Sequence, residues 1–136
     1  MADFKFLKTM IRVKNLDKSI DFYTRILGMR VLRKKDYSVR KFTVAFVGYG
    51  DEAQNTVIEL TYNWDRQEPY DFGGGFGYLA FGVPDIYAAC ERLEKEGVSI
   101  LRPPGPMVQS ESVIAFIEDP DGYRIELVEK KEMKFV

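Results

Sequence analysis

The stretch "TVIELTYN" at residues 56–63 recurs in altered form as "YRIELVEK" at residues 123–130. Each copy holds the triplet Ile-Glu-Leu, centred on Glu59 in the first and on Glu126 in the second. Aliphatic residues on both sides of one polar residue are typical of a β-strand with one face buried. Two such strands far apart in one chain indicate an internal repeat.

The segments around these strands repeat in the same order. In the first half we expect a strand at 6–13, a helix at 14–29 and strands at 30–34, 41–50 and 55–63. In the second half we expect a strand at 76–83, a helix at 84–97, strands at 98–106 and 112–122, the latter ending in the turn "EDPDG" (118–122), and a strand at 123–130. Asn15 or Asp17 can cap the first helix and Gly28 ends it, while Pro84, Asp85 and Gly97 delimit the second.

The repeat predicts an α+β fold of two tandem β-α-β-β-β modules, residues 4–64 and 76–130, in a single domain spanning 1–136. The Gly-rich segment 70–77 is expected to be the hinge. A four-stranded sheet with a helix on one face leaves its other face uncovered. We therefore expect the eight strands to curl into a cup-shaped half-barrel with a ligand cleft on its concave side.

The amino-acid composition excludes several kinds of catalysis and several kinds of partner. The chain has no histidine, which excludes Ser-His-Asp and Cys-His catalysis and imidazole metal ligation. The net charge is −1, and the basic cluster at 33–41 is interpreted as a solvated loop, so no nucleic-acid partner is expected. No apolar run reaches the roughly 18 residues of a membrane span. The one cysteine, Cys90, is expected to be a buried helix residue in a cytoplasmic protein.

Four polar residues fall at equivalent positions of the two modules. Lys8 and Tyr78 lie on the first strand of each module, and Glu59 and Glu126 on the last. Considered alone, each glutamate would most simply be a surface residue whose side chain points to solvent. Because both recur with polar partners on the equivalent first strands, we favour a shared inward cluster of the four side chains.

The chain resembles glyoxalase I (lactoylglutathione lyase), in its short bacterial type, of the vicinal-oxygen-chelate superfamily. The resemblance rests on "KTMIRVKNLDKSIDFYTRILGMRVLR", "TVAFVGYGDEAQNTVIELTYNW", "GFGYLAFGV" and "VIAFIEDPDGYRIELVE", which cover nearly the whole chain. It implies the glyoxalase/bleomycin-resistance/dioxygenase fold, a homodimer with its cleft at the subunit interface, and isomerisation of the hemithioacetal of glutathione and methylglyoxal to S-lactoylglutathione.

The resemblance also implies a Ni or Zn ion held by His, Glu, His and Glu. The two glutamates match Glu59 and Glu126, whereas both histidine positions are replaced, by Lys8 and Tyr78. Arg12 and Asn63 match positions that hold the γ-glutamyl end of glutathione. An arginine that contacts glutathione in some members is Gly74 here, and "PPGPMVQSES" offers no clear match for the basic residue near the glycine carboxylate.

These replacements predict that no metal cofactor is bound, because an ammonium carries its own charge and a neutral phenol is a weak ligand. Lys8 is expected to take the place of the ion between the carboxylates, with Tyr78 as a hydrogen-bond donor. The leading hypothesis is a protein that binds a small ligand, such as a glutathione conjugate, with isomerase activity lost or strongly attenuated. A second is a metal-free isomerase or lyase with Lys8, Glu59, Tyr78 and Glu126 as catalytic residues. A third is a metal-dependent lyase whose ion is held by the two glutamates and water.

Overall fold

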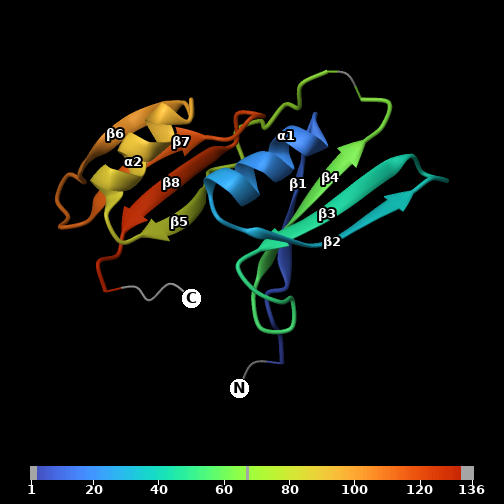
Figure 1. The fold of residues 1–136 in the computed structure, drawn as a ribbon, viewed down its shortest axis with the longest axis horizontal. Coiled ribbons are helices and arrows are strands. Elements are labelled where there is room, and N and C mark those ends of the chain that lie inside the picture. Colours follow the sequence, from blue (N-terminus) through green and yellow to red (C-terminus); the bar gives the residue numbers. More distant parts are fainter. Residues whose placement is uncertain (1–2, 67, 133–136) are drawn as a thin grey trace. The chain divides into compact units, whose positions relative to one another are not determined.

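A computed structural model of the chain describes residues 3–66 and 68–132. The chain divides into two compact units, unit 1 (Met1–Asp71) and unit 2 (Phe72–Val136). Each unit contains one four-stranded sheet, and a helix covers one face of that sheet (Figure 1). The predicted α+β class is confirmed in both units, whereas their closure into one cup stays a prediction.

Both units have the same element order. Unit 1 contains β1 (Lys8–Arg12), α1 (Leu16–Asp21), the π-helical turn η1 (Phe22–Ile26), β2 (Arg30–Tyr37), β3 (Phe42–Gly48) and β4 (Val57–Asn63). Unit 2 contains β5 (Leu79–Val83), α2 (Ile86–Lys95), β6 (Ile100–Pro106), β7 (Val113–Glu118) and β8 (Arg124–Glu129). The predicted β-α-β-β-β pattern therefore occurs twice.

The two sheets also share their topology. The strand orders are β1-β4-β3-β2 and β5-β8-β7-β6, with the first strand of each unit parallel to the last and the other pairs antiparallel. In unit 1 Phe46 is the register partner of Glu59, and in unit 2 Phe116 is the register partner of Glu126. The predicted equivalence of Glu59 and Glu126 is thus reproduced in the hydrogen-bonded register.

The helices begin and end where the sequence indicates. The side chains of Asn15 and Asp85 each accept a hydrogen bond of 3.1 Å from the backbone N–H three residues on. Asn15, not Asp17, is therefore the first cap. Gly28 and Gly97 end the helical segments with φ of 81° and 82°, a conformation in which a Cβ is strained. No helix in the described ranges is long and apolar enough to cross a membrane.

Most buried residues of each unit lie between its helix and the facing side of its sheet, and in unit 1 Val44, Phe46 and Val57 form a second buried cluster on the opposite face. Leu60 and Leu127, which follow the two repeated glutamates, are 0% and 1% exposed. Because side chains alternate along a strand, burial of these leucines places Glu59 and Glu126 on the opposite face, the one without a helix. The core residues on the helices are Leu16, Phe22, Tyr23 and Ile26 in unit 1 and Ile86, Cys90 and Leu93 in unit 2.

Three local expectations need correction. The basic cluster at 33–41 is not all loop, because β2 continues to Tyr37 and only the residues after it form the turn. Tyr78 lies one residue before β5 and not within the strand. The first helix widens after Asp21 into the π-helical η1, where the Thr24 hydroxyl donates a 2.6 Å hydrogen bond to the carbonyl of Ile20.

The Gly-rich segment is anchored to unit 2 by aromatic contacts. The rings of Phe72 and Tyr123 stack at 4.2 Å between centroids, and Phe76 meets Tyr123 edge-on at 5.3 Å. Asp119 supports Tyr123 in turn, since its Oδ1 accepts a 2.9 Å hydrogen bond from the Tyr123 N–H. Through these contacts, the glycine segment packs as part of unit 2. Hinge motion in this segment stays a prediction.

Candidate functional site

The helix-free face of the unit 1 sheet, here called the unit 1 site face, carries most of the predicted site residues of that unit. Strand register places Met10, Phe46 and Arg33 in line with Glu59 across the four strands. The other members follow from alternation along each strand. The face consists of Lys8, Met10, Arg12, Arg33, Lys35, Tyr37, Phe42, Val44, Phe46, Val57, Glu59, Thr61 and Asn63.

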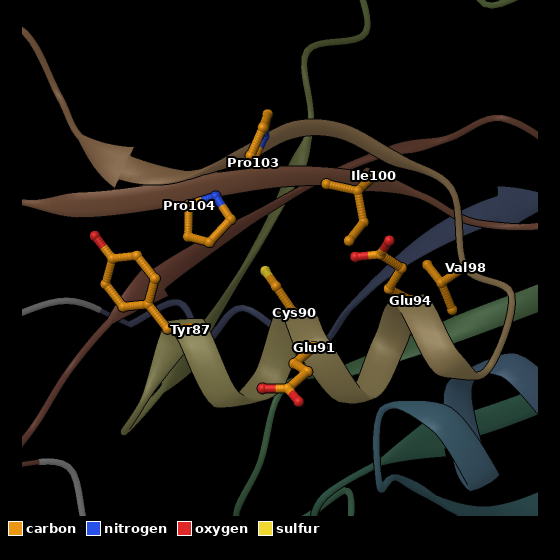
Figure 2. Close-up of a pocket in the computed structure, with 8 residues that line it drawn as sticks. All are labelled: Tyr87, Cys90, Glu91, Glu94, Val98, Ile100, Pro103 and Pro104. Carbon is orange, nitrogen blue, oxygen red and sulfur yellow. The ribbon is translucent and has the colours of Figure 1, made fainter.

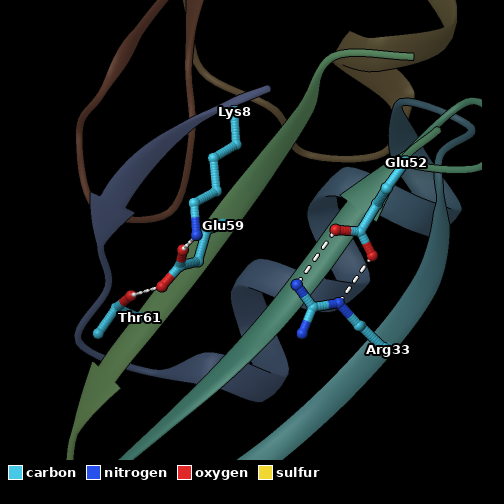
Figure 3. A network of polar contacts seen from close by, with 5 residues as sticks. All are labelled: Lys8, Arg33, Glu52, Glu59 and Thr61. Carbon is cyan, nitrogen blue, oxygen red and sulfur yellow. Dashed lines mark hydrogen bonds and ion pairs between the residues drawn. The ribbon is translucent and has the colours of Figure 1, made fainter. Parts of the chain in front are cut away.

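Lys8 and Glu59 form the ion pair that the sequence predicts. The Lys8 Nζ lies 2.6 Å from Glu59 Oε1, and the Thr61 hydroxyl donates a 3.2 Å hydrogen bond to Glu59 Oε2 (Figure 3). The side chain of Glu59 is 15% exposed and that of Lys8 is 45% exposed. Both carboxylate oxygens of Glu59 therefore have a partner within unit 1.

A second cation shares the same phenylalanine ring. The Lys8 Nζ lies 5.0 Å from the centroid of Phe46, and the Arg33 guanidinium carbon lies 3.7 Å from it. Arg33 also forms a fork with Glu52, with distances of 2.7 Å from Nε to Oε2 and 3.1 Å from Nη2 to Oε1 (Figure 3). The face thus holds two neighbouring ion pairs around one buried aromatic ring.

The fork changes the titration of both of its members. The hydrogen bond to Glu52 raises the pKa of Arg33, and the same bond lowers the pKa of Glu52 below its ordinary value. A carboxyl group with a lowered pKa stabilises the fold above its unfolded-state pKa. That contribution is lost as the pH falls through the folded-state pKa.

We expect a double-mutant cycle of Arg33→Ala and Glu52→Ala to give a small favourable coupling free energy at neutral pH. The value is small because the two side chains are 51% and 35% exposed. The coupling should vanish as the pH drops below the usual carboxyl range of about 4. Urea unfolding of the four proteins at several pH values measures it, and a coupling that persists in acid would contradict the assignment.

The unit 2 half of the predicted site is arranged differently. Glu126 is 9% exposed, and within the described part of unit 2 its carboxylate makes no hydrogen bond or ion pair. Tyr78 is 51% exposed, and its ring meets Phe116 edge-on at 5.4 Å between centroids. The expected hydrogen bond from Tyr78 to Glu126 is therefore not formed within this unit. Whether all four side chains join in one cluster stays a prediction.

The predicted ligand-binding residues lie at one end of the unit 1 site face. Arg12 is the last residue of β1 and pairs in register with Thr61, and Asn63 is the last residue of β4. The Asn63 amide donates a 3.1 Å hydrogen bond to the Tyr70 hydroxyl. Lys8 and Arg12 therefore lie four residues apart along one strand of the same face, which can contact one extended ligand.

Sequence reasoning missed three residues of this face that contact the predicted ion pair or its ring, and the loop residue Glu52 that pairs with one of them. Thr61 could have been found by alternation from Glu59, and Phe46 by its repeat partner Phe116. No sequence signal joins Arg33 to Glu52, which are 19 residues apart and lie on a strand and in a loop. Their contact follows from the pairing of β2 with β3 and the return of the chain after β3.

A cavity of about 510 Å³ lies within unit 2 (Figure 2). It lies between α2 and β6 and is lined by Tyr87, Cys90, Glu91, Glu94, Val98, Ile100, Pro103 and Pro104. Cys90 is 4% exposed, and burial raises the pKa of its thiol. The prediction of a buried, helical Cys90 is therefore confirmed. A thiol that is harder to ionise is also a poor nucleophile.

The chain is similar to one protein superfamily over most of its length, and to one enzyme family within it. The model of the Glyoxalase/Bleomycin resistance protein/Dioxygenase superfamily matches residues 5–127, and this is the class that two β-α-β-β-β modules define. The lactoylglutathione lyase of Neisseria meningitidis is 55% identical over 127 residues, 93% of this chain and 91% of that protein. The probable lactoylglutathione lyase of Synechocystis sp. is 56% identical over 128 residues, 94% and 97% of the two chains.

A solved structure agrees with these relatives. Glyoxalase I from Zea mays matches with a TM-score of 0.89 and 42% identity, over 95% of this chain and 46% of the maize chain. The chain belongs to the glyoxalase I (lactoylglutathione lyase) family.

The residues at the positions where the resemblance implies a Ni or Zn ion do not fit such an ion. Glu59 Oε1 is in contact with the Lys8 ammonium and Oε2 accepts the Thr61 hydrogen bond, so each oxygen already has a partner. A divalent ion at Glu59 would lie beside a positive charge, and the two would repel each other. Tyr78 supplies a phenol in place of the second imidazole, and a neutral phenol is a weak ligand.

Proposed function

We propose that the protein is a glyoxalase I homologue that binds a small ligand, with a glutathione conjugate as the first candidate, and that its metal-dependent isomerase activity is lost or strongly attenuated. The observation that carries the proposal is the 2.6 Å contact between Lys8 Nζ and Glu59 Oε1. An internal monovalent cation occupies one of the carboxylates that a metal would need. It provides less Lewis acidity than a divalent ion, because its charge is lower and is shared with Glu59.

The ligand-holding part of the face supports binding. Arg12 can pair with a carboxylate, and the Asn63 amide can donate to one, at the positions where the family holds the γ-glutamyl end. We propose that the protein forms a homodimer whose cleft lies at the subunit interface, and that it works in the cytoplasm. Neither a nucleic acid nor a membrane is a proposed partner.

The alternative is an active lactoylglutathione lyase, or a related isomerase or lyase, with a non-canonical site. Glu126 favours it, because its carboxylate has no partner in the described part of unit 2 and can take a proton from carbon. Lys8 and Tyr78 would then stabilise an enediolate as cation and hydrogen-bond donor. The ammonium beside Glu59 disfavours the third hypothesis, an ion held by two glutamates and water.

One assay separates these functions. Formation of S-lactoylglutathione from methylglyoxal and glutathione is followed with added Ni, with added Zn and with EDTA, beside the lactoylglutathione lyase of Neisseria meningitidis as the positive control. We expect no turnover above background, together with calorimetric binding of S-methylglutathione that Arg12→Ala weakens. Turnover insensitive to EDTA would favour the metal-free enzyme. Turnover that EDTA abolishes, at a rate near that of the control, would overturn the proposal.

A further inference from the structure

We propose that Lys8 alone closes the site to divalent metal ions, and that the replacement at Tyr78 only removes a ligand. The inference rests on the proposed function, in which no metal is bound, and names the residue that enforces it. Its basis is the difference between the two repeat-equivalent halves of the predicted site, one in each unit: Lys8 carries a charge in contact with Glu59, and Tyr78 carries none.

In unit 1 the blocking group is held from two sides. The Lys8 ammonium contacts Glu59 Oε1 at 2.6 Å and lies 5.0 Å from the centroid of the Phe46 ring. Glu59 itself is 15% exposed and is fixed by the Thr61 hydroxyl. A metal ion that approaches Glu59 must therefore displace the Lys8 ammonium, which is held by the Glu59 carboxylate and by the Phe46 ring. The Glu59 carboxylate cannot easily turn away, because the Thr61 hydroxyl holds it.

In unit 2 the equivalent position carries no charge. The Tyr78 side chain is 51% exposed and its ring rests edge-on against Phe116. The Glu126 carboxylate has no hydrogen bond or ion pair among the residues described in unit 2. Neither Tyr78 nor Phe116 carries a charge that would oppose a cation, so Tyr78 weakens metal binding only by failing to donate a lone pair.

The charges around Lys8 explain why its ammonium determines whether a metal ion can bind at Glu59. The nearby cation Arg33 is already balanced by its fork with Glu52. Lys8 and Glu59 balance each other in the same way, so the unit 1 site face holds two neutral pairs. Removing the Lys8 charge leaves the carboxylate of Glu59 without a cation in direct contact, and a mostly buried carboxylate in that state attracts a cation.

The test measures Ni and Zn binding by isothermal titration calorimetry and by competition with a chromophoric chelator, so that enzyme activity is not needed. The proteins are the wild type, Lys8→Ala, Lys8→Met, Lys8→His and Tyr78→His. Circular dichroism establishes that each is folded, and the two neutral substitutions at position 8 guard against one failing to fold. Lys35→Ala is the matched control, because the Lys35 Nζ lies 4.9 Å from the centroid of the Tyr37 ring but forms no ion pair with Glu59.

We expect the wild type, Tyr78→His and Lys35→Ala to show equally weak binding. A folded Lys8→Ala or Lys8→Met should bind at least about 10-fold more tightly, and Lys8→His more tightly still, because even a changed outer-shell partner shifts metal affinity by about 10–100-fold. Tyr78→His binding as tightly as Lys8→His, or no gain in any folded position-8 variant, would overturn the inference. Tight metal binding by the wild type would instead contradict the proposed loss of the metal.

Discussion

The double variant Lys8→His, Tyr78→His is expected to isomerise the hemithioacetal of methylglyoxal and glutathione about 10²–10³-fold faster than the wild type when Ni or Zn is present. Two neutral imidazoles suit these ions, and removal of the ammonium releases Glu59 as a ligand. A metal ion that polarises the enediolate oxygens contributes several kcal/mol to transition-state stabilisation, and each 1.36 kcal/mol is about tenfold in rate.

The rate of S-lactoylglutathione formation measures this gain, and EDTA should remove it. Glu126→Gln in the double-variant background is the matched control, since it keeps the side-chain volume and removes a carboxylate. We expect it to return the rate to the wild-type level. A double variant that binds metal and remains inactive would show that positions other than 8 and 78 also limit the reaction, which would contradict this prediction.

The second large effect is expected at the core and not at the site. Leu60→Ala should lower the free energy of unfolding by about 2–5 kcal/mol, because Leu60 is 0% exposed and its truncation leaves a cavity. Leu127→Ala, at the repeat-equivalent position with 1% exposure, should cost a similar amount. Urea unfolding followed by circular dichroism measures both.

Leu101→Ala serves as the control, since Leu101 is 43% exposed and loses little packing on truncation. We expect it to change the free energy of unfolding by about 0.5 kcal/mol or less. If Leu60→Ala cost no more than the control, the helix-facing side of the unit 1 sheet could not be its core. Alternation from Leu60 would then no longer place Glu59 on the opposite face.

Much of the fold could be predicted because the repeat supplies two independent readings of each element. The Ile-Glu-Leu triplets indicate strands whose glutamates oppose buried leucines, and the structure has β4 and β8 with that alternation. The caps and stops at Asn15, Asp85 and Gly97 are local and follow from one or two residues. Element ends depend on strand pairing as well: Tyr78 lies outside β5 because pairing with β8 starts at Leu79.

The candidate site was only partly predictable. The contact of Lys8 with Glu59 was expected from the repeat, because both fall on neighbouring strands of one sheet and carry opposite charges. Its asymmetry was not expected: the equivalent pair Tyr78 and Glu126 makes no hydrogen bond within unit 2. The rotamers of exposed side chains depend on neighbours from several strands, and a linear pattern does not specify them.

By itself, the sequence determined the doubled β-α-β-β-β order, the face on which each glutamate lies and the absence of histidine from the chain. Only the tertiary structure decided which further charges meet at the site. Strict alternation from Val31, the partner of Val47, would pair Leu32 with Phe46, but an irregularity between Val31 and Arg33 pairs Arg33 with Phe46 instead. Such a bulge adds one residue to a strand and moves every later side chain to the other face. Whether Leu32 or Arg33 lies opposite Phe46 depends on how β2 pairs with β3, and so only the folded sheet decides it.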